Sequence, residues 1–122
     1  MTARDILTTA MTMLGYTRNN GEISGEQELF KRGIIAVNQA YADLFYLLGG
    51  KDYKAITSSN DTINLPERIL NDIMPYGVAM FIAQSENDGD SQALYANIYN
   101  KKRASVRIAN TVQDVMPRGS DF

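Results

Sequence analysis

The sequence contains no cysteine and no histidine among its 122 residues. Without cysteine there is no disulfide framework and no thiolate nucleophile, an absence that fits a reducing compartment. Without either residue the chain also lacks the commonest general base and the usual zinc ligands. Its nine glycines never form a phosphate-binding pattern such as G-x-x-x-x-G-K-[ST] or G-x-G-x-x-G. The sequence therefore predicts a protein that is not an enzyme and has no catalytic residue, cofactor or metal ion.

Long apolar runs are missing as well. The densest run, Val78–Ala83, is far shorter than the 18 or so residues of a membrane span. Arg4 and Asp5 interrupt the start of the chain and no apolar signal region follows, so we expect neither a signal peptide nor membrane contact. The net charge is −2. Proteins that bind nucleic acid through its phosphates usually carry an excess of Lys and Arg, so this balance disfavours that class, although it leaves room for a local basic strip.

The first half of the chain predicts two helices. Residues 2–5 resemble a capping box with Asp in place of Glu, and Gly15 suits a left-handed C-cap onto which Tyr16 can fold back, so we expect a short helix over 3–14. A longer helix follows Ser24 and ends at Gly49. Its apolar residues recur at alternating steps of four and three: Phe30, Ile34, Val37, Tyr41, Leu44 and Leu48.

The second half begins with residues 51–65, which alternate apolar with polar side chains and predict a short β-hairpin or an extended insertion. Pro66 suits the start of a third helix, which we expect to continue to about Ser85 with a kink at Pro75. Residues 73–83 are apolar nearly all round, which is typical of a central, buried helix. Asp90 suits the N-cap of a fourth helix that fades after Ala109.

Together these patterns predict a mainly α, four-helix bundle-like single domain. The helical domain spans 1–109, with the hairpin or extended insertion between the second and third helices, and 110–122 form an extended C-terminal tail. The tail carries three spaced apolar residues, Val112, Val115 and Met116. The last turns of the second helix, around Phe45, Tyr46 and Leu47, are apolar on every side, so one side faces the core and the other must meet something else.

Two charged clusters have alternative interpretations. Glu86, Asp88 and Asp90 could bind Mg²⁺ or Ca²⁺ through oxygen ligands, but no calcium-loop Glu follows, and we favour a solvated turn with an N-cap. A basic group could contact phosphates, but we favour charge that complements the C-terminal end of the fourth helix. That group comprises Lys101, Lys102, Arg103 and Arg107.

Tyrosines are numerous, and we expect a mixture of core and interface positions. Six of them fall within the predicted helices and the insertion: Tyr41, Tyr46, Tyr53, Tyr76, Tyr95 and Tyr99.

A family resemblance is carried by five segments taken in chain order. They are Leu14-Gly15-Tyr16, Val37-Asn38-Gln39-Ala40-Tyr41-Ala42-Asp43-Leu44, Asp61-Thr62-Ile63-Asn64-Leu65-Pro66, Leu70-Asn71-Asp72-Ile73-Met74-Pro75-Tyr76-Gly77-Val78-Ala79 and Leu94-Tyr95-Ala96-Asn97-Ile98-Tyr99-Asn100. In this order the chain, over about residues 4–116, resembles the head-to-tail connector (adaptor, or head-completion) proteins of tailed bacteriophages.

The resemblance implies a structural virion protein at the head–tail interface, assembled in the cytoplasm of the bacterial host. Such a subunit docks on the portal protein and forms a homo-oligomeric ring that continues the DNA channel. The ring offers an attachment platform to a tail-completion protein, and DNA passes through without sequence-specific binding. An isolated subunit of this kind can stay monomeric until a portal templates the ring. By position, the resemblance adds Tyr53, Ile56, Val112, Val115 and Met116 to Phe45, Tyr46 and Leu47 as residues expected at the portal or subunit interface.

Two other functions stay open from the sequence. One is a small helical regulator of phage origin that binds protein or nucleic acid, although the basic residues of its only candidate recognition helix bunch at the wrong end. The other is a helical interaction protein with no viral role, which only the family resemblance separates from the connector.

Overall fold

Five helices form the regular structure of residues 1–16 and 26–115, the part of the chain that the computed structural model describes. Their bounds are α1 (Ala3–Met13), α2 (Glu26–Leu47), α3 (Glu67–Asp72), α4 (Met74–Ser85) and α5 (Gly89–Val115). These residues contain no strand, so the predicted mainly α single domain is confirmed. No helix in the same ranges is both long and apolar enough to cross a membrane.

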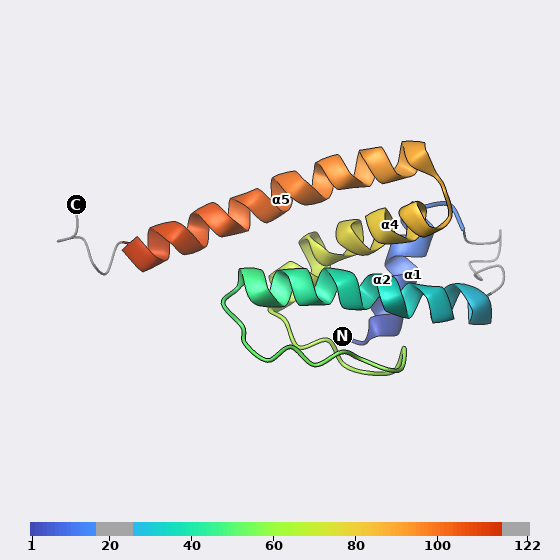
Figure 1. Ribbon diagram of the computed structural model, residues 1–122, viewed down its shortest axis with the longest axis horizontal. Coiled ribbons are helices and arrows are strands. Elements are labelled where there is room, and N and C mark those ends of the chain that lie inside the picture. The colour runs from blue at the N-terminus through green and yellow to red at the C-terminus, as the bar shows by residue number, and fades with distance from the viewer. Residues whose placement is uncertain (17–25, 116–122) are drawn as a thin grey trace.

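Helix α4 lies at the centre of the fold. The other four helices all pack against it, with α2 and α5 on its two flanks and α1 behind (Figure 1). Met74, Val78 and Ala79 on α4 are fully buried, and Ile82 is nearly so. The prediction that residues 73–83 form a central, buried element is confirmed, and the physical reason is the lack of any polar face on this segment.

The predicted third helix is divided into two. Residue Ile73, with φ −116° and ψ −50°, separates α3 from α4, so the chain breaks where only a kink was expected. Pro75 lies in the first turn of α4, where its missing N–H costs no hydrogen bond, and its ring disfavours a continuous helix from α3. The described chain therefore has five helices rather than four.

The ends of α1 match the sequence prediction. Asp5 Oδ2 accepts a hydrogen bond from the Thr2 amide at 3.0 Å, and the Asp5 amide bonds back to Thr2 Oγ1 at 3.4 Å. These reciprocal bonds form a capping box. At the other end Gly15 has φ +80°, and the amides of Gly15 and Tyr16 both bond to carbonyls of the last turn. This arrangement is a Schellman motif, which turns Tyr16 back onto the core.

The start of α5 differs from the prediction. Asp88, not Asp90, caps this helix, because Asp88 Oδ1 accepts the Ser91 amide at 3.2 Å and the Asp88 carbonyl accepts the Gln92 amide at 2.9 Å. Asn87, with φ +58°, ends α4 one residue earlier. The connection between the two helices is thus tighter than the sequence suggested, since one residue ends α4 and the next begins α5.

Residues 51–65 take the extended alternative and form no hairpin. Their only β pairing is an isolated bridge between Thr62 and Thr2. The Ala3 amide bonds the Asp61 carbonyl at 2.9 Å, and the Ile63 amide bonds the Met1 carbonyl at 3.0 Å. The insertion therefore pairs with the chain start rather than with itself, and it runs beside α2 (Figure 1).

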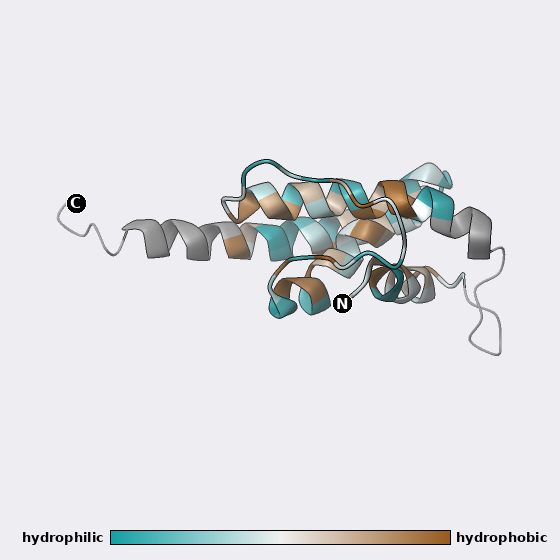
Figure 2. Cartoon of the chain, turned by 90° about the horizontal axis from the view of Figure 1, so that it is seen from below, coloured by the Kyte–Doolittle hydropathy of each residue, from teal (hydrophilic) through white to brown (hydrophobic). Residues whose placement is uncertain are grey.

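Helix α5 runs through Val115, six residues beyond Ala109, where the periodicity fades. No Gly or Pro occurs between Ala109 and Pro117, so nothing in this stretch interrupts the helical backbone. The predicted start of an extended tail at residue 110 therefore falls inside a helix, and residues 116–122 lie outside the described part. In Figure 1 the C-terminal end of α5 extends beyond the other helices. Figure 2 shows brown, hydrophobic residues and teal, hydrophilic residues alternating along α2.

Candidate interaction surface

Side chains of α2 face the core on one side and contact the insertion and α5 on the others. Val37, Ala40 and Leu44 are fully buried. Between them stand Asn38, Tyr41 and Asp43, the polar residues of the Val37–Leu44 segment that carried the family resemblance, together with exposed Gln39. Asn38 and Tyr41 face the insertion, and Asp43 faces α5.

Asn38 fastens the insertion to α2. Its Nδ2 donates to the Ile56 carbonyl at 3.0 Å, and its Oδ1 accepts the Ile56 amide at 2.9 Å and the Tyr53 hydroxyl. The Tyr41 hydroxyl accepts the Asn64 amide at 3.0 Å, near the far end of the insertion. Burial, followed by the influence of Tyr41 and Tyr46, raises the pKa of the Tyr53 hydroxyl to about 12, so this donor keeps its proton. Side chains of α2 therefore hold residues 51–65, an extended segment that does not form a sheet.

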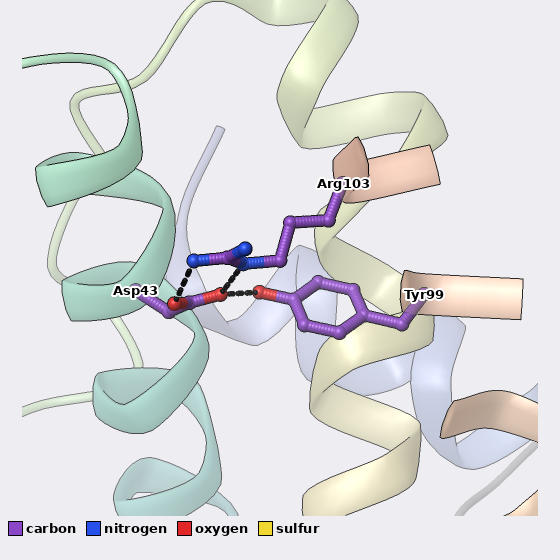
Figure 3. Close-up of polar contacts among 3 residues, drawn as sticks. All are labelled: Asp43, Tyr99 and Arg103. Atoms are coloured by element: carbon purple, nitrogen blue, oxygen red, sulfur yellow. Dashed lines mark hydrogen bonds and ion pairs between the residues drawn. The ribbon is translucent and has the colours of Figure 1, made fainter. Parts of the chain in front are cut away.

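Asp43 fastens α5 to α2 through a three-residue network, which we call the Asp43 clasp (Figure 3). Asp43 Oδ2 accepts the Tyr99 hydroxyl at 2.6 Å and Arg103 Nε at 2.7 Å, while Oδ1 accepts Arg103 Nη2 at 2.9 Å. The two Arg103 bonds form a bidentate pair, the strongest geometry for an ion pair of this type. Tyr99 is 2 % exposed.

The charge state of the clasp follows from its surroundings. Burial alone would raise the pKa of Asp43, but the hydrogen bonds from Arg103 and Tyr99 outweigh it, and the pKa is lowered. Burial and the bond to Asp43 raise the pKa of Tyr99, and the same carboxylate raises the pKa of Arg103. At neutral pH the clasp therefore holds a carboxylate, a guanidinium and a neutral phenol, which is the arrangement of a structural lock and not of an acid–base pair.

Glycine makes room for the clasp on α4. A Cβ added at Gly77 would come within 2.6 Å of the Tyr99 ring, a distance that would force the ring to move. Glycine at this position lets α5 approach the α4 backbone closely. Because the ring lies directly over the α4 backbone, its hydroxyl reaches Asp43 on the far helix.

The basic group on α5 is less available than the sequence suggested. Lys102 Nζ lies 2.8 Å from Asp72 and 5.3 Å from the centre of the Tyr76 ring, and Arg103 belongs to the clasp. These residues lie in the middle of the helix, because α5 continues to Val115, so their charges do not complement the dipole at its C-terminal end. The side chain of Arg107 lies outside the described part. Two of the four cations thus have carboxylate partners within the protein.

The acidic cluster has structural partners of its own. Glu86 Oε1 lies 2.7 Å from Arg32 Nη2 of α2, and Asp88 caps α5. No group of three or more candidate metal ligands occurs within the described ranges. The favoured interpretation, a turn with an N-cap, agrees with this geometry except that the capping residue is Asp88.

The residues expected at an interface only partly come together. Phe45, Tyr46 and Tyr53 form an aromatic cluster with Tyr41 beneath them; ring centres lie 5.5 Å apart for Phe45 and Tyr46 and 5.9 Å apart for Phe45 and Tyr53. Tyr46 is 54 % exposed, while Phe45 and Tyr53 are half-buried. This aromatic cluster lies at the C-terminal end of α2, the same end of the molecule toward which α5 extends (Figure 1).

The remaining expected residues lie elsewhere. Leu47 is half-buried against the core, and Ile56, only 8 % exposed, is itself part of the core. Burial of Ile56 follows from Asn38, which binds both backbone groups of this residue and draws it inward. Val112 and Val115 lie in the last turns of α5, where the structure describes only the backbone, and Met116 lies outside the described residues.

The tyrosines divide as expected into core and surface. Tyr41 and Tyr99 are buried and Tyr46 is exposed; Tyr53, Tyr76 and Tyr95 are intermediate. Sequence reasoning missed Asn38 and Asp43, because each pairs with a residue at least 15 positions away and no local spacing signals the contact.

Comparison of the chain with protein-family models, with curated proteins and with solved structures finds no match.

Proposed function

We propose that this protein is a head–tail connector subunit of a tailed bacteriophage. In this role it docks on the portal protein, forms a ring that continues the DNA channel, and offers a platform to the tail-completion protein. It acts by binding and catalyses no reaction. Its place is the head–tail interface of the virion, after assembly in the host cytoplasm. The proposal starts from the family resemblance of the sequence segments given above.

The observation that supports it best is the direction of α5. The helix leaves the body of the protein at the end that also carries the aromatic cluster, and the Asp43 clasp fixes its course at the point of exit. Helix α5 is 27 residues long, which corresponds to about 40 Å, and its C-terminal end extends beyond the helices against which it packs. A ring subunit needs surfaces that reach its neighbours, and a projecting helix beside an exposed aromatic side chain supplies such surfaces.

The nucleic-acid-binding alternative is less well supported. Lys102 and Arg103 are engaged by Asp72 and Asp43, so phosphate binding would have to break contacts within the protein. The net charge of −2 adds no electrostatic attraction. A channel through which DNA slides needs neither base contacts nor a strongly basic wall, so the charge balance is compatible with the connector role.

The deciding experiment is co-sedimentation of the protein with portal rings from the same source, followed by imaging of the complex. We expect stoichiometric binding and a new ring of density under the portal, and the binding should persist with added salt because apolar contacts do not weaken with ionic strength. Binding that falls steeply with salt would instead indicate phosphate contacts.

A matched pair of variants locates the surface. Tyr46 and Leu94 are both 54 % exposed, but Tyr46 lies at the end of α2 and Leu94 near the start of α5. Tyr46→Ala should weaken portal binding about tenfold or more, as loss of an interface aromatic does, whereas Leu94→Ala should leave it unchanged. No binding by folded protein to competent portal rings would overturn the proposed function.

A further inference from the structure

The aromatic cluster at the C-terminal end of α2 holds one tyrosine that is fixed in place but not covered. Tyr46 is 54 % exposed, although its ring centre lies 5.5 Å from that of Phe45 and 6.3 Å from that of Tyr53. Its hydroxyl accepts the Tyr53 amide at 3.3 Å. Because these contacts already orient the side chain, a partner that buries it restricts little further motion, and exposed tyrosines of this kind are typical anchors of protein interfaces.

Two lysines border this cluster, on the segment by which the chain leaves α2 for the insertion (Figure 1). A Cβ added at Gly50 would come within 2.6 Å of the Phe45 ring, and Tyr53 belongs to the cluster, so Lys51 lies between two residues that touch it. Lys54 directly follows Tyr53. Both lysines are exposed, and within the part of the chain that the structure describes neither side chain forms an ion pair or a hydrogen bond.

The charge of this border is opposite in sign to that of the chain. Residues 49–54 contain two Lys and one Asp, which gives a net charge of +1, whereas the whole chain carries −2. Asp43, the only carboxylate in the C-terminal half of α2, is already paired with Arg103. An exposed tyrosine beside unpaired lysines is complementary to a surface that combines apolar and acidic side chains.

We propose that Tyr46, Lys51 and Lys54, which we call the Tyr46 surface, bind an acidic segment of a partner protein. An apolar side chain of the partner covers the Tyr46 ring, and its Asp or Glu side chains meet the two lysines at the rim. The inference rests on the proposed function for the partner, the portal, and goes further by giving the chemistry that this partner presents. Charges at the rim of an interface mainly steer association, so the lysines speed docking while the buried aromatic contact persists in salt.

Nucleic acid fits the Tyr46 surface less well. Its affinity for proteins grows with the number of phosphates that cations neutralise, and here Asp52 offsets one of only two lysines. The net charge of −2 adds repulsion at longer range. A protein segment with a few carboxylates and an apolar side chain needs no larger basic surface than the one present.

A titration with synthetic peptides tests the Tyr46 surface without the portal. The probe is a capped peptide in which one Phe stands between two Glu–Glu pairs, and the control peptide has Lys in place of each Glu. We expect the acidic peptide to shift the NMR signals of Tyr46, Lys51 and Lys54. The basic peptide should bind about tenfold or more weakly, because its charges are repelled at the rim.

Charge variants should change the affinity for the acidic peptide in opposite directions. Lys51→Glu/Lys54→Glu should weaken binding about fivefold or more, since two attractive exposed pairs become repulsive. Asp52→Asn removes the offsetting charge and keeps a residue type that tolerates the φ of +61° at this position, so binding should strengthen about twofold. Lys101→Glu, at an exposed position in the middle of α5, is the matched control and should leave the affinity unchanged.

The opposite results would overturn the proposal. These are no binding of the acidic peptide, equal binding of both peptides, or a loss in Lys101→Glu as large as in the double variant. Tighter binding of an oligothymidylate to the same side chains would overturn it in favour of a phosphate ligand.

Portal rings separate this inference from the proposed function. If the rings bind wild type and Lys51→Glu/Lys54→Glu at the same rate, the inference alone fails, because charge then plays no part in docking. If the acidic peptide binds the Tyr46 surface but portal rings do not bind the protein, the connector role alone fails.

Discussion

Residues 51–65 contain neither helix nor strand, whereas α5 is regular helix as far as Val115, and yet side-chain and backbone contacts hold the irregular segment in place. The insertion is tied to α2 by Asn38 and Tyr41 and to the chain start by backbone hydrogen bonds. Helix α5 is held to α2 by the Asp43 clasp at Arg103, and its backbone continues as helix to Val115. Regular secondary structure and a fixed position are thus separate properties, because the first depends on local backbone bonding and the second on contacts between distant residues.

The largest effect is expected when the side-chain contacts that hold the insertion to α2 are removed. Asn38→Ala leaves the Ile56 amide and carbonyl without their partner and leaves the Tyr53 hydroxyl only the Asn38 backbone carbonyl at 3.3 Å, and we expect the free energy of unfolding to fall by about 2–3 kcal/mol. Chemical denaturation measures the loss. Amide hydrogen exchange should quicken across 51–65 while α4 stays protected. Gln39→Ala, at the exposed neighbouring position, is the control and should change stability by less than about 0.5 kcal/mol. An equal loss in both variants would contradict the role given to Asn38.

The next largest loss of stability is expected from a change in the Asp43 clasp. Asp43→Asn keeps the side-chain shape but removes the charge opposite Arg103; both side chains are about one-third exposed, at 33 % and 30 %, so water partly compensates. We expect a loss of about 1–2 kcal/mol at neutral pH. The control is Asp72→Asn, which removes the charge that pairs with Lys102. Asp72 is more exposed than Asp43, so this variant should lower the free energy of unfolding by less than about 0.5 kcal/mol.

The same variant gives a pH test with a defined sign. The pKa of Asp43 in the folded protein lies below its ordinary value of 3.8. Its stabilising contribution is therefore complete above that ordinary pKa and is lost as pH falls through the lower folded-state pKa. The difference in unfolding free energy between wild type and Asp43→Asn should stay constant from about pH 8 to about pH 5 and shrink below about pH 4. A difference that persisted in acid would show that the carboxylate charge is not what stabilises the clasp.

The smallest effect is expected at the C-terminal end of the chain. Deleting residues 110–122 removes nothing from the described core, whose last buried member is Tyr99, so the free energy of unfolding should change by less than about 0.5 kcal/mol. Binding to portal rings or to neighbouring copies should be lost. A large fall in the thermal midpoint would contradict the view that this end serves contacts between molecules.

Local signals in the sequence were enough to predict most helix bounds. The capping box at Thr2, the turn at Gly15 and the end of α2 before Gly49 all depend on residues within one helical turn, and each is found in the structure. Local ambiguity explains the errors. Asp88 and Asp90 are both good N-caps, and in the structure Asp88, which follows Asn87 with its φ of +58°, takes that role. Pro75 can either kink or break a helix, and packing of α3 and α4 determines which.

The candidate site was harder to predict, for a different reason. The aromatic cluster could be anticipated because Phe45 and Tyr46 are adjacent in the chain. The pair Asp43 and Arg103 is separated by 60 positions, and its partners become visible only once α2 and α5 are placed on the same helix, α4. The family resemblance placed Ile56 at an interface by position, but Ile56 lies in the core, where Asn38 binds both its backbone amide and its carbonyl.

The central place of α4 also bears on how the chain folds as it is made. Helices α1 and α2 bury their apolar faces against α4, which the ribosome synthesises only after both of them and the insertion. Until Ser85 has cleared the exit tunnel, the earlier segments have no surface that completes their core, so α1, α2 and the insertion wait as loosely associated pieces. Collapse onto α4 then joins all of them late in synthesis, and a translational pause that holds Ser85 inside the tunnel would leave the growing chain more open to proteolysis than a pause after Ser85 has cleared it.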